Sequence, residues 1–169
     1  MARLTSAALV ALLALLILSV TPAMAFNRAS SQATMLRLIN HARTSRGLRA
    51  VKVHRALGEA ALGHSRDMIA HDYFAHSSYA GGSVAKRARG AGYSISGWSH
   101  WEVGEVIAWG KSCRGTPEAI FKAWMRSSAH RRIILAKRWR DVGLGACRGT
   151  FRGLSGVAMY TVDFGRRVQ

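Results

Sequence analysis

Residues 123–135 read Ala-Trp-Met-Arg-Ser-Ser-Ala-His-Arg-Arg-Ile-Ile-Leu, and they predict the end of one helix and a brief helical turn after it. The helix begins at Thr116-Pro117-Glu118, where a capping residue, a first-turn proline and an early acid stand together. We expect it to end near Ser127. The turn over residues 129–135 carries His130 ahead of three large apolar residues. His130 is therefore a candidate site residue.

Two segments nearer the N-terminus also place an ionisable residue among apolar or aromatic ones. Gly104-Glu105-Val106-Ile107-Ala108 lies within a predicted strand over residues 103–109, and His76 follows Tyr73-Phe74 in a predicted turn. An ionised carboxylate in an apolar strand must be paired, coordinated or in contact with water, because burying an unpaired charge is costly. Glu105 is therefore either a site residue or lies at the exposed end of its strand.

The rest of the chain predicts helices first and strands late. Further helices are expected over residues 30–46, 56–71 and 84–89, and further strands over 142–147 and 156–164. Residues 48–54 allow either a short extended segment or a loop. This order of elements is typical of the α+β class.

Two residues of the first two helices carry specific expectations. Arg43 is expected to be available to solvent, because the apolar residues of its helix lie on another face. His64 recurs at the apolar spacing of the second helix and is interpreted as a packed core histidine. The helical period therefore predicts opposite environments for these two basic side chains.

The first 25 residues form a predicted secretory signal. Arg3 supplies a positive start, residues 7–20 are an apolar run, and Ala23-Met24-Ala25 is a small-x-small cleavage site. The alternative is an uncleaved membrane anchor, but the run is short for a bilayer span and ends at a proline. We therefore expect residues 26–169 to form a single exported domain with no transmembrane span, in the extracellular space or the periplasm.

Only two cysteines are present, Cys113 and Cys147. In an exported chain the oxidising environment lets such a pair persist as a disulfide, so we expect one bridge between them. The alternative is two free or metal-binding thiols. The sequence has no Cys-x-x-Cys spacing, which makes metal binding the weaker interpretation.

The sequence is strongly basic, with 25 lysines and arginines against 8 acidic residues and a formal net charge of +17. Such a charge attracts polyanions, among them anionic envelope polymers, acidic lipid head groups and acidic polysaccharides. The alternative is a solvated surface without a dedicated partner, since charge alone specifies solubility and loose attraction. Nucleic acid is not expected as a specific partner.

The segments described above resemble the characteristic segments of one known family. Residues 73–78, Tyr-Phe-Ala-His-Ser-Ser, resemble the Tyr-Phe-Ser-His-Thr-Ser of bacterial CAP domains, and residues 104–108 resemble their Gly-Glu-Asn-Ile-Ala. Residues 123–135 are similar to the family's Ala-Trp-Met-Asn-Ser-Pro-Gly-His-Arg-x-Asn-Ile-Leu. Asp-Val-Gly-Leu-Gly at 141–145 and Thr-Val-Asp-Phe-Gly at 161–165 fit its closing strands. CAP denotes the cysteine-rich secretory protein, antigen 5 and pathogenesis-related 1 superfamily, and the resemblance is to its bacterial SCP-like extracellular proteins.

The resemblance implies an α-β-α sandwich, with a central antiparallel sheet flanked by helices and a cleft where His76, Glu105 and His130 converge. In some members of the family this cleft binds divalent cations. The sequence departs from the eukaryotic pattern after Trp124, where Met125-Arg126-Ser127 leaves no place for a second glutamate. Two asparagines of the bacterial pattern are also replaced, by Val106 and Ile133.

Three functions are compatible with the sequence. The favoured hypothesis is a non-catalytic binding module, in which a cleft of His76, Glu105, His130 and Glu102 and a basic surface engage an anionic or lipid-like extracellular or envelope component. No cofactor is required, and a divalent cation such as zinc is a candidate ligand of His76, His130 and Glu105. The alternatives are a metal-dependent or Glu/His-assisted hydrolase, with Glu105 and His130 as candidate catalytic residues, and a basic toxin whose binding to polyanions or membranes is sensitive to salt.

Overall fold

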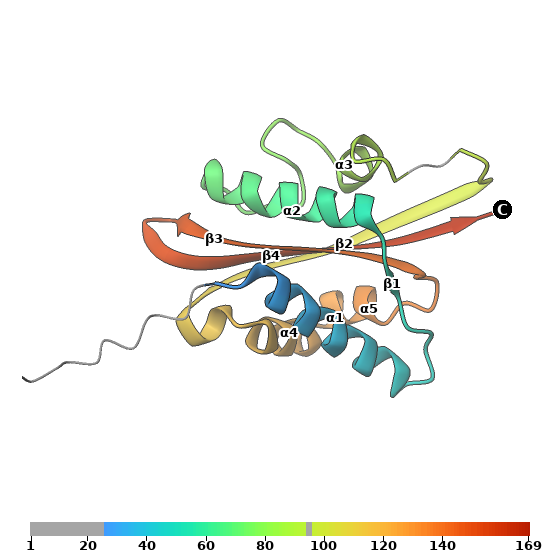
Figure 1. The fold of residues 1–169 in the computed structure, drawn as a ribbon, viewed down its shortest axis with the longest axis horizontal. Helices are drawn as coiled ribbons and strands as arrows, with labels where there is room; N and C mark the ends of the chain where they lie inside the picture. Colours follow the sequence, from blue (N-terminus) through green and yellow to red (C-terminus); the bar gives the residue numbers. More distant parts are fainter. Residues whose placement is uncertain (1–25, 94–95) are drawn as a thin grey trace, which may run out of the picture.

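The computed structural model describes residues 26–93 and 96–169, so the predicted signal segment lies outside the described residues. Figure 1 shows a sheet between two layers of helices, with α2 and α3 over one face and α1, α4 and α5 over the other. The predicted α+β class and its sandwich of helices around a sheet are confirmed.

The helices lie close to their predicted positions. They are α1 (Arg28–Thr44), α2 (Arg55–Ala70), α3 (Val84–Gly90), α4 (Pro117–Arg126) and α5 (Ser128–Ile134), with a short 3-10 helix, η1 (Ser112–Gly115), before α4. Side-chain oxygens cap several of them, because the first turn of a helix leaves backbone N–H groups without partners. Ser83 caps α3, Thr116 caps α4 and Ser127 caps α5, each by accepting from the N–H three residues on.

The sheet is mixed rather than purely antiparallel. Its strands are β1 (Lys52–Val53), β2 (His100–Lys111), β3 (Asp141–Phe151) and β4 (Leu154–Val168), in the order β1-β3-β4-β2. The pairs β3–β4 and β4–β2 are antiparallel as expected, but β1 pairs with β3 in parallel. Two residues are too few to show the alternation of a strand. The sequence therefore did not decide between a strand and a loop over residues 48–54. In this order β2 is an edge strand.

Glycines on β3 let α2 lie directly against the sheet. A Cβ at Gly143 would stand 2.0 Å from the backbone of Leu57, and one at Gly145 would stand 2.3 Å from the backbone of Ala61. Both distances are far below any real contact of a Cβ atom. The close approach brings the buried side of α2, including His64, over the centre of the sheet.

The largest hydrophobic core lies on the other face of the sheet. Arg43 is buried next to Ile134, one of its members. The core's other buried members include Met35, Ile39, Trp124, Trp139, Val162 and Phe164. Arg43 is fully buried, where its Nε donates to the carbonyl of Arg49 and its Nη1 donates to those of Ile134 and Ala136. The expectation that Arg43 faces solvent is therefore wrong, because its guanidinium satisfies one carbonyl beyond the end of α1 and two at or just after the end of α5.

The expected disulfide is not formed, since Cys113 and Cys147 are both free thiols. Cys147 lies on β3 and packs toward α2, whereas Cys113 lies in η1, which packs against α4 on the other face. The strand β4 also stands between β3 and β2, which ends just before η1. The two thiols therefore lie on opposite faces of the sheet.

Labelling of the native protein with a maleimide should therefore modify one cysteine quickly and the other slowly. Cys113 is exposed, whereas burial raises the pKa of the half-buried Cys147 to about 11, which lowers its thiolate fraction. Mass spectrometry should show one label in the native protein and two after denaturation without reductant. A denatured, unreduced protein that takes up no label would instead contain the disulfide.

Candidate functional site

Glu105 on β2 is the centre of a buried polar cluster. Its side chain is only 1% exposed. The Oε1 atom lies 2.7 Å from Nδ1 of His76, and Oε2 lies 2.5 Å from Nη2 of Arg87. His64 from α2 adds its Nε2 at 3.9 Å from Oε2 and also bonds the carbonyl oxygen of Ala75 at 2.9 Å. Both oxygens of the carboxylate are thus engaged inside the protein.

Arg87 connects this carboxylate to the segment that carries His76. Its side chain comes from α3 and is 11% exposed. While Nη2 contacts Glu105, Nη1 donates to the carbonyls of His76 and Gly82 and to the hydroxyl of Ser78. One guanidinium therefore holds both the buried acid of β2 and the chain between His76 and Gly82.

A second acid, Asp163, lies beside Glu105 on the neighbouring strand β4, directly opposite it in the sheet register. Asp163 is fully buried and lies within hydrogen-bond reach of Glu105. Its burial, and then the charge of Glu105, raise the pKa of Asp163 well above its usual value. Burial therefore favours the protonated form of Asp163.

The pKa values of Glu105 and His64 are lowered, in contrast to that of Asp163. Burial alone raises the pKa of Glu105, but the hydrogen bond from His76 and the charge of Arg87 outweigh it and leave that pKa below its usual value. Burial lowers the pKa of His64, so this imidazole is neutral at neutral pH, as a packed core histidine should be. The fixed charges are thus the anion of Glu105 and the cation of Arg87, which cancel.

The variant Asp163→Asn should gain stability relative to the wild type as the pH rises above about 4, the ordinary pKa of an aspartate in the unfolded chain. The folded wild type keeps the proton of Asp163 while the unfolded chain releases it, because the folded pKa is raised. Stability therefore falls with rising pH above this value, and asparagine removes that loss. Thermal unfolding followed by circular dichroism measures the difference, and a difference that does not change with pH would contradict a protonated Asp163.

A cavity of about 420 Å³ lies along the open edge of β2, beside this cluster. Its walls are mostly apolar, and they come from the segment before His76, from β2 and from α4. The lining residues are Phe74, Ala75, His76, Ile107, Ala108, Trp109, Ala123, Trp124, Ser127 and His130. The shape and lining are those of a ligand cleft with a few polar groups at one end.

The structure brings His76 and His130 to this cleft and places Glu105 behind His76. His130 bonds the Ser127 hydroxyl through Nδ1 at 2.8 Å. Burial and the neighbouring charge of His76 lower the pKa of His130, as expected for two imidazoles that share one cavity. Among the predicted cleft residues, these two are therefore the ones that a ligand can reach.

Glu102 is not part of the cleft, and the expectation that it supplements Glu105 is wrong. Residues three apart on a strand point to opposite faces of the sheet. The carboxylate of Glu102 instead pairs with Arg138 at 2.8 Å, with His100 at 3.2 Å and with Arg166 at 3.8 Å.

The residues do not fit a zinc ion held by three protein ligands. Within the described part of the chain, no group of three His, Cys, Asp or Glu side chains is placed to hold a metal. Glu105 also has both oxygens engaged, one of them by a permanent cation. The predicted set of His76, His130 and Glu105 is therefore a pair of imidazoles with a carboxylate behind one of them.

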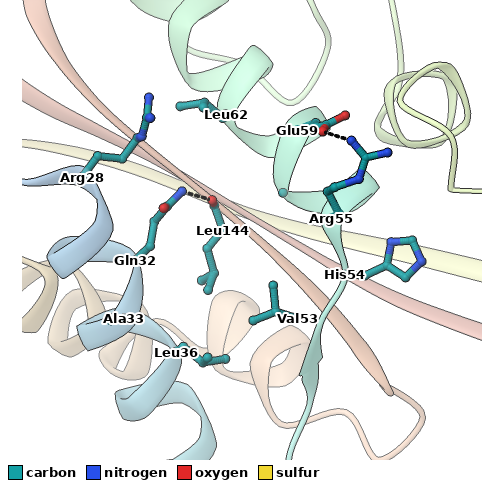
Figure 2. Close-up of a pocket in the computed structure, with 11 residues that line it drawn as sticks. Arg28, Gln32, Ala33, Leu36, Val53, His54, Arg55, Glu59, Leu62 and Leu144 are labelled. Carbon is teal, nitrogen blue, oxygen red and sulfur yellow. Dashed lines mark hydrogen bonds and ion pairs between the residues drawn. The ribbon is translucent and has the colours of Figure 1, made fainter.

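A second cavity, of about 380 Å³, lies between α1 and the start of α2 and is separate from the predicted residues (Figure 2). Its floor includes Leu36, Leu62 and Leu144. Arg55 and Glu59 pair with each other at 2.8 Å, so their charges are already satisfied. This cavity contains none of the cluster around Glu105.

The chain is similar to several known proteins. The profile described as "CAP: Cysteine-rich secretory protein family" matches residues 36–164. The chain belongs to the CAP family. Two curated relatives from Bacillus subtilis (strain 168) are "Uncharacterized protein YkwD", 33% identical over 111 residues, and "Uncharacterized membrane protein YlbC", 29% identical over 119 residues. These matches cover 66% and 70% of this chain but only 40% and 32% of the relatives, so the chain spans less than half the length of either.

Solved structures with the same fold include two bacterial proteins. One is an extracellular protein with an SCP domain from Bacillus anthracis, at a TM-score of 0.67 and 24% identity, covering 82% of this chain and 41% of that one. The other is an outer surface protein from Borrelia burgdorferi, at a TM-score of 0.69 and 16% identity, covering 84% of this chain and 96% of that one. At these identities the likeness supports the CAP fold alone. No helix among the described residues of this CAP domain is long and apolar enough to cross a membrane.

Proposed function

We propose that this CAP domain is a non-catalytic extracellular binding module whose cleft takes an apolar group bearing an anionic head. The observation that carries the proposal is the composition of the cleft. Its walls are apolar and aromatic, and its reachable ionisable groups are the two imidazoles of His76 and His130. An apolar chain or ring fits the walls, and an acidic head fits the imidazole end.

The same geometry favours binding over hydrolysis. A general base must lie within hydrogen-bond reach of the proton that it removes. Glu105 is 1% exposed and bonded on both oxygens, so it does not face a substrate in the cleft. The Oγ of Ser127 accepts from the backbone N–H of His130 as a helix cap, in addition to contacting the imidazole. The proposal therefore assigns no catalytic residue.

The basic surface next to the cleft supports an anionic partner. Four cationic side chains from α5 and the segment after it line a hollow of about 610 Å³: Arg131, Arg132, Lys137 and Arg138. With a net charge of +17, the protein attracts anionic envelope polymers and lipid head groups. Export to the extracellular space or the periplasm belongs to the proposal. It is supported by the predicted signal and by the extracellular and surface proteins among the structural neighbours.

Calorimetric titration with monododecyl phosphate, below its micelle concentration, tests the proposal. We expect saturable binding to the wild type and binding weakened at least about 10-fold in Ala123→Leu, because the larger side chain fills part of the cleft. Ala129→Leu is the matched control, since Ala129 is exposed on α5 but does not line the cleft. A His76→Ala/His130→Ala variant should also bind more weakly, because it removes the polar end.

Two results would overturn the proposed function. One is the absence of saturable binding to the folded wild type. The other is binding of the same strength in all variants that collapses with added salt, which would assign the activity to the basic surface alone.

A further inference from the structure

We propose that Arg87 is a positioning residue for the cleft: through Glu105 it fixes which ring nitrogen of His76 carries the hydrogen, and so sets the character of the Nε2 atom that the cleft presents. Arg87 does not line the cavity. It acts through the carboxylate behind His76. Because His76 lines the proposed cleft, the value of this arrangement to a ligand rests on the proposed function.

The imidazole of His76 is the donor in its contact with Glu105. Glu105 is ionised, and a carboxylate can only accept hydrogen bonds. Its contact of 2.7 Å with Nδ1 of His76 therefore requires a hydrogen on Nδ1. When the imidazole is neutral, Nε2 then carries a lone pair and is an acceptor. It donates to an anionic head only when the ring takes up a second proton, since both nitrogens are donors in the imidazolium form. The side chain is 58% exposed and lines the cleft.

Arg87 holds this geometry because it contacts both the carboxylate of Glu105 and the backbone of His76. A guanidinium has only donors, and Arg87 directs one nitrogen at Oε2 of Glu105 and another at three acceptors in the segment from His76 to Gly82. The acid and the backbone of the histidine are thus fixed to the same planar group. Other neighbours of His76 and Glu105 are His64, which is neutral and bonded to Ala75, Asp163, whose pKa is raised by burial, and His130 across the cleft. Among the described groups, Arg87 is the permanent cation in contact with the carboxylate.

The isosteric variant Glu105→Gln provides a sharp test. A glutamine has one acceptor oxygen and one donor NH₂ group. If Arg87 dominates, its donors face the amide oxygen, and the NH₂ group must face Nδ1 of His76. Nδ1 then accepts, and the hydrogen moves to Nε2. If Arg87 does not dominate, the amide turns its oxygen to His76 and the hydrogen stays on Nδ1.

Nitrogen-15 NMR of the His76 ring, recorded on the neutral imidazole, distinguishes these outcomes. We expect a hydrogen on Nδ1 in the wild type, a hydrogen on Nε2 in Glu105→Gln, and a return to Nδ1 or a mixture in Arg87→Gln/Glu105→Gln. The control Arg89→Gln, on the exposed side of α3, should match the wild type. A wild type with its hydrogen on Nε2, or a Glu105→Gln variant that keeps it on Nδ1, would overturn the inference. The NMR experiment contains no ligand, so a failure of this inference can be told apart from a failure of the proposed binding function.

Discussion

Replacing Arg87 by methionine is expected to lower the free energy of unfolding by about 3–5 kcal/mol, the usual cost of removing one partner of a buried ion pair. The variant leaves Glu105 as an uncompensated charge, because its side chain is 1% exposed and lies next to Asp163, whose pKa is raised by burial. It also removes the donors to the segment between His76 and Gly82. Urea unfolding followed by tryptophan fluorescence measures the change.

Two further variants separate this cause from a general effect of losing an arginine. Arg89→Met removes an exposed guanidinium from the same helix and should change stability by less than about 0.5 kcal/mol. The double variant Arg87→Met/Glu105→Gln should recover part of the loss, since it no longer buries a charge. A loss in Arg87→Met of about 1 kcal/mol or less would show that Glu105 is solvated, as in an exposed ion pair.

The second large effect is expected at the contact between α2 and β3. Gly145→Ala should destabilise the protein by about 3 kcal/mol, at the upper end of the usual range for overpacking. The added Cβ would meet backbone carbon and oxygen atoms of Ala61 at 2.3 Å. A helix backbone cannot turn aside as a side chain can, so α2 must shift away from the sheet. Thermal unfolding followed by circular dichroism gives the change.

Gly63→Ala on α2 is the matched substitution with the opposite expected sign. A Cβ at Gly63 meets nothing within 4 Å, and the position lies in a helix interior away from the core. Alanine there should stabilise the protein by about 0.5–1 kcal/mol, since glycine is the poorer helix former. Equal effects at Gly63 and Gly145 would contradict the close packing of α2 on β3.

The sequence predicted the parts of the fold that follow a local period. Helices and strands were found because apolar residues repeat at helical spacing around Leu57 and His64 and form apolar runs near Val106 and Val162. The sequence did not decide between a strand and a loop at β1, because the two residues Lys52 and Val53 are too few to show a period. Arg43 was placed at the surface because sequence period gives the face of a helix but not the carbonyl groups that reach it from α5.

Only part of the site was predicted, because long-range contacts leave no pattern in the sequence. His76, His130 and Glu105 stand in distinctive segments, whereas Arg87 stands in an ordinary basic helix beside Lys86 and Arg89. Its partner is 18 residues away, and a contact at that separation leaves no local signal.

For Asp163, the sequence predicts only a place in a closing strand. Its importance follows from the sheet register, which sets it opposite Glu105. The missing bond between Cys113 and Cys147 likewise follows from strand order, which composition does not contain.

The central claim is that the cleft along β2 is the binding site, and NMR mapping tests it most directly. Monododecyl phosphate is titrated into the nitrogen-15 labelled protein, and shifts are followed at the ring nitrogens of His76 and His130 and the indoles of Trp109 and Trp124. The account predicts that these signals move together and saturate, while those of the cavity between α1 and α2 do not move. Shifts confined to that cavity, or to the basic residues of α5, would contradict it.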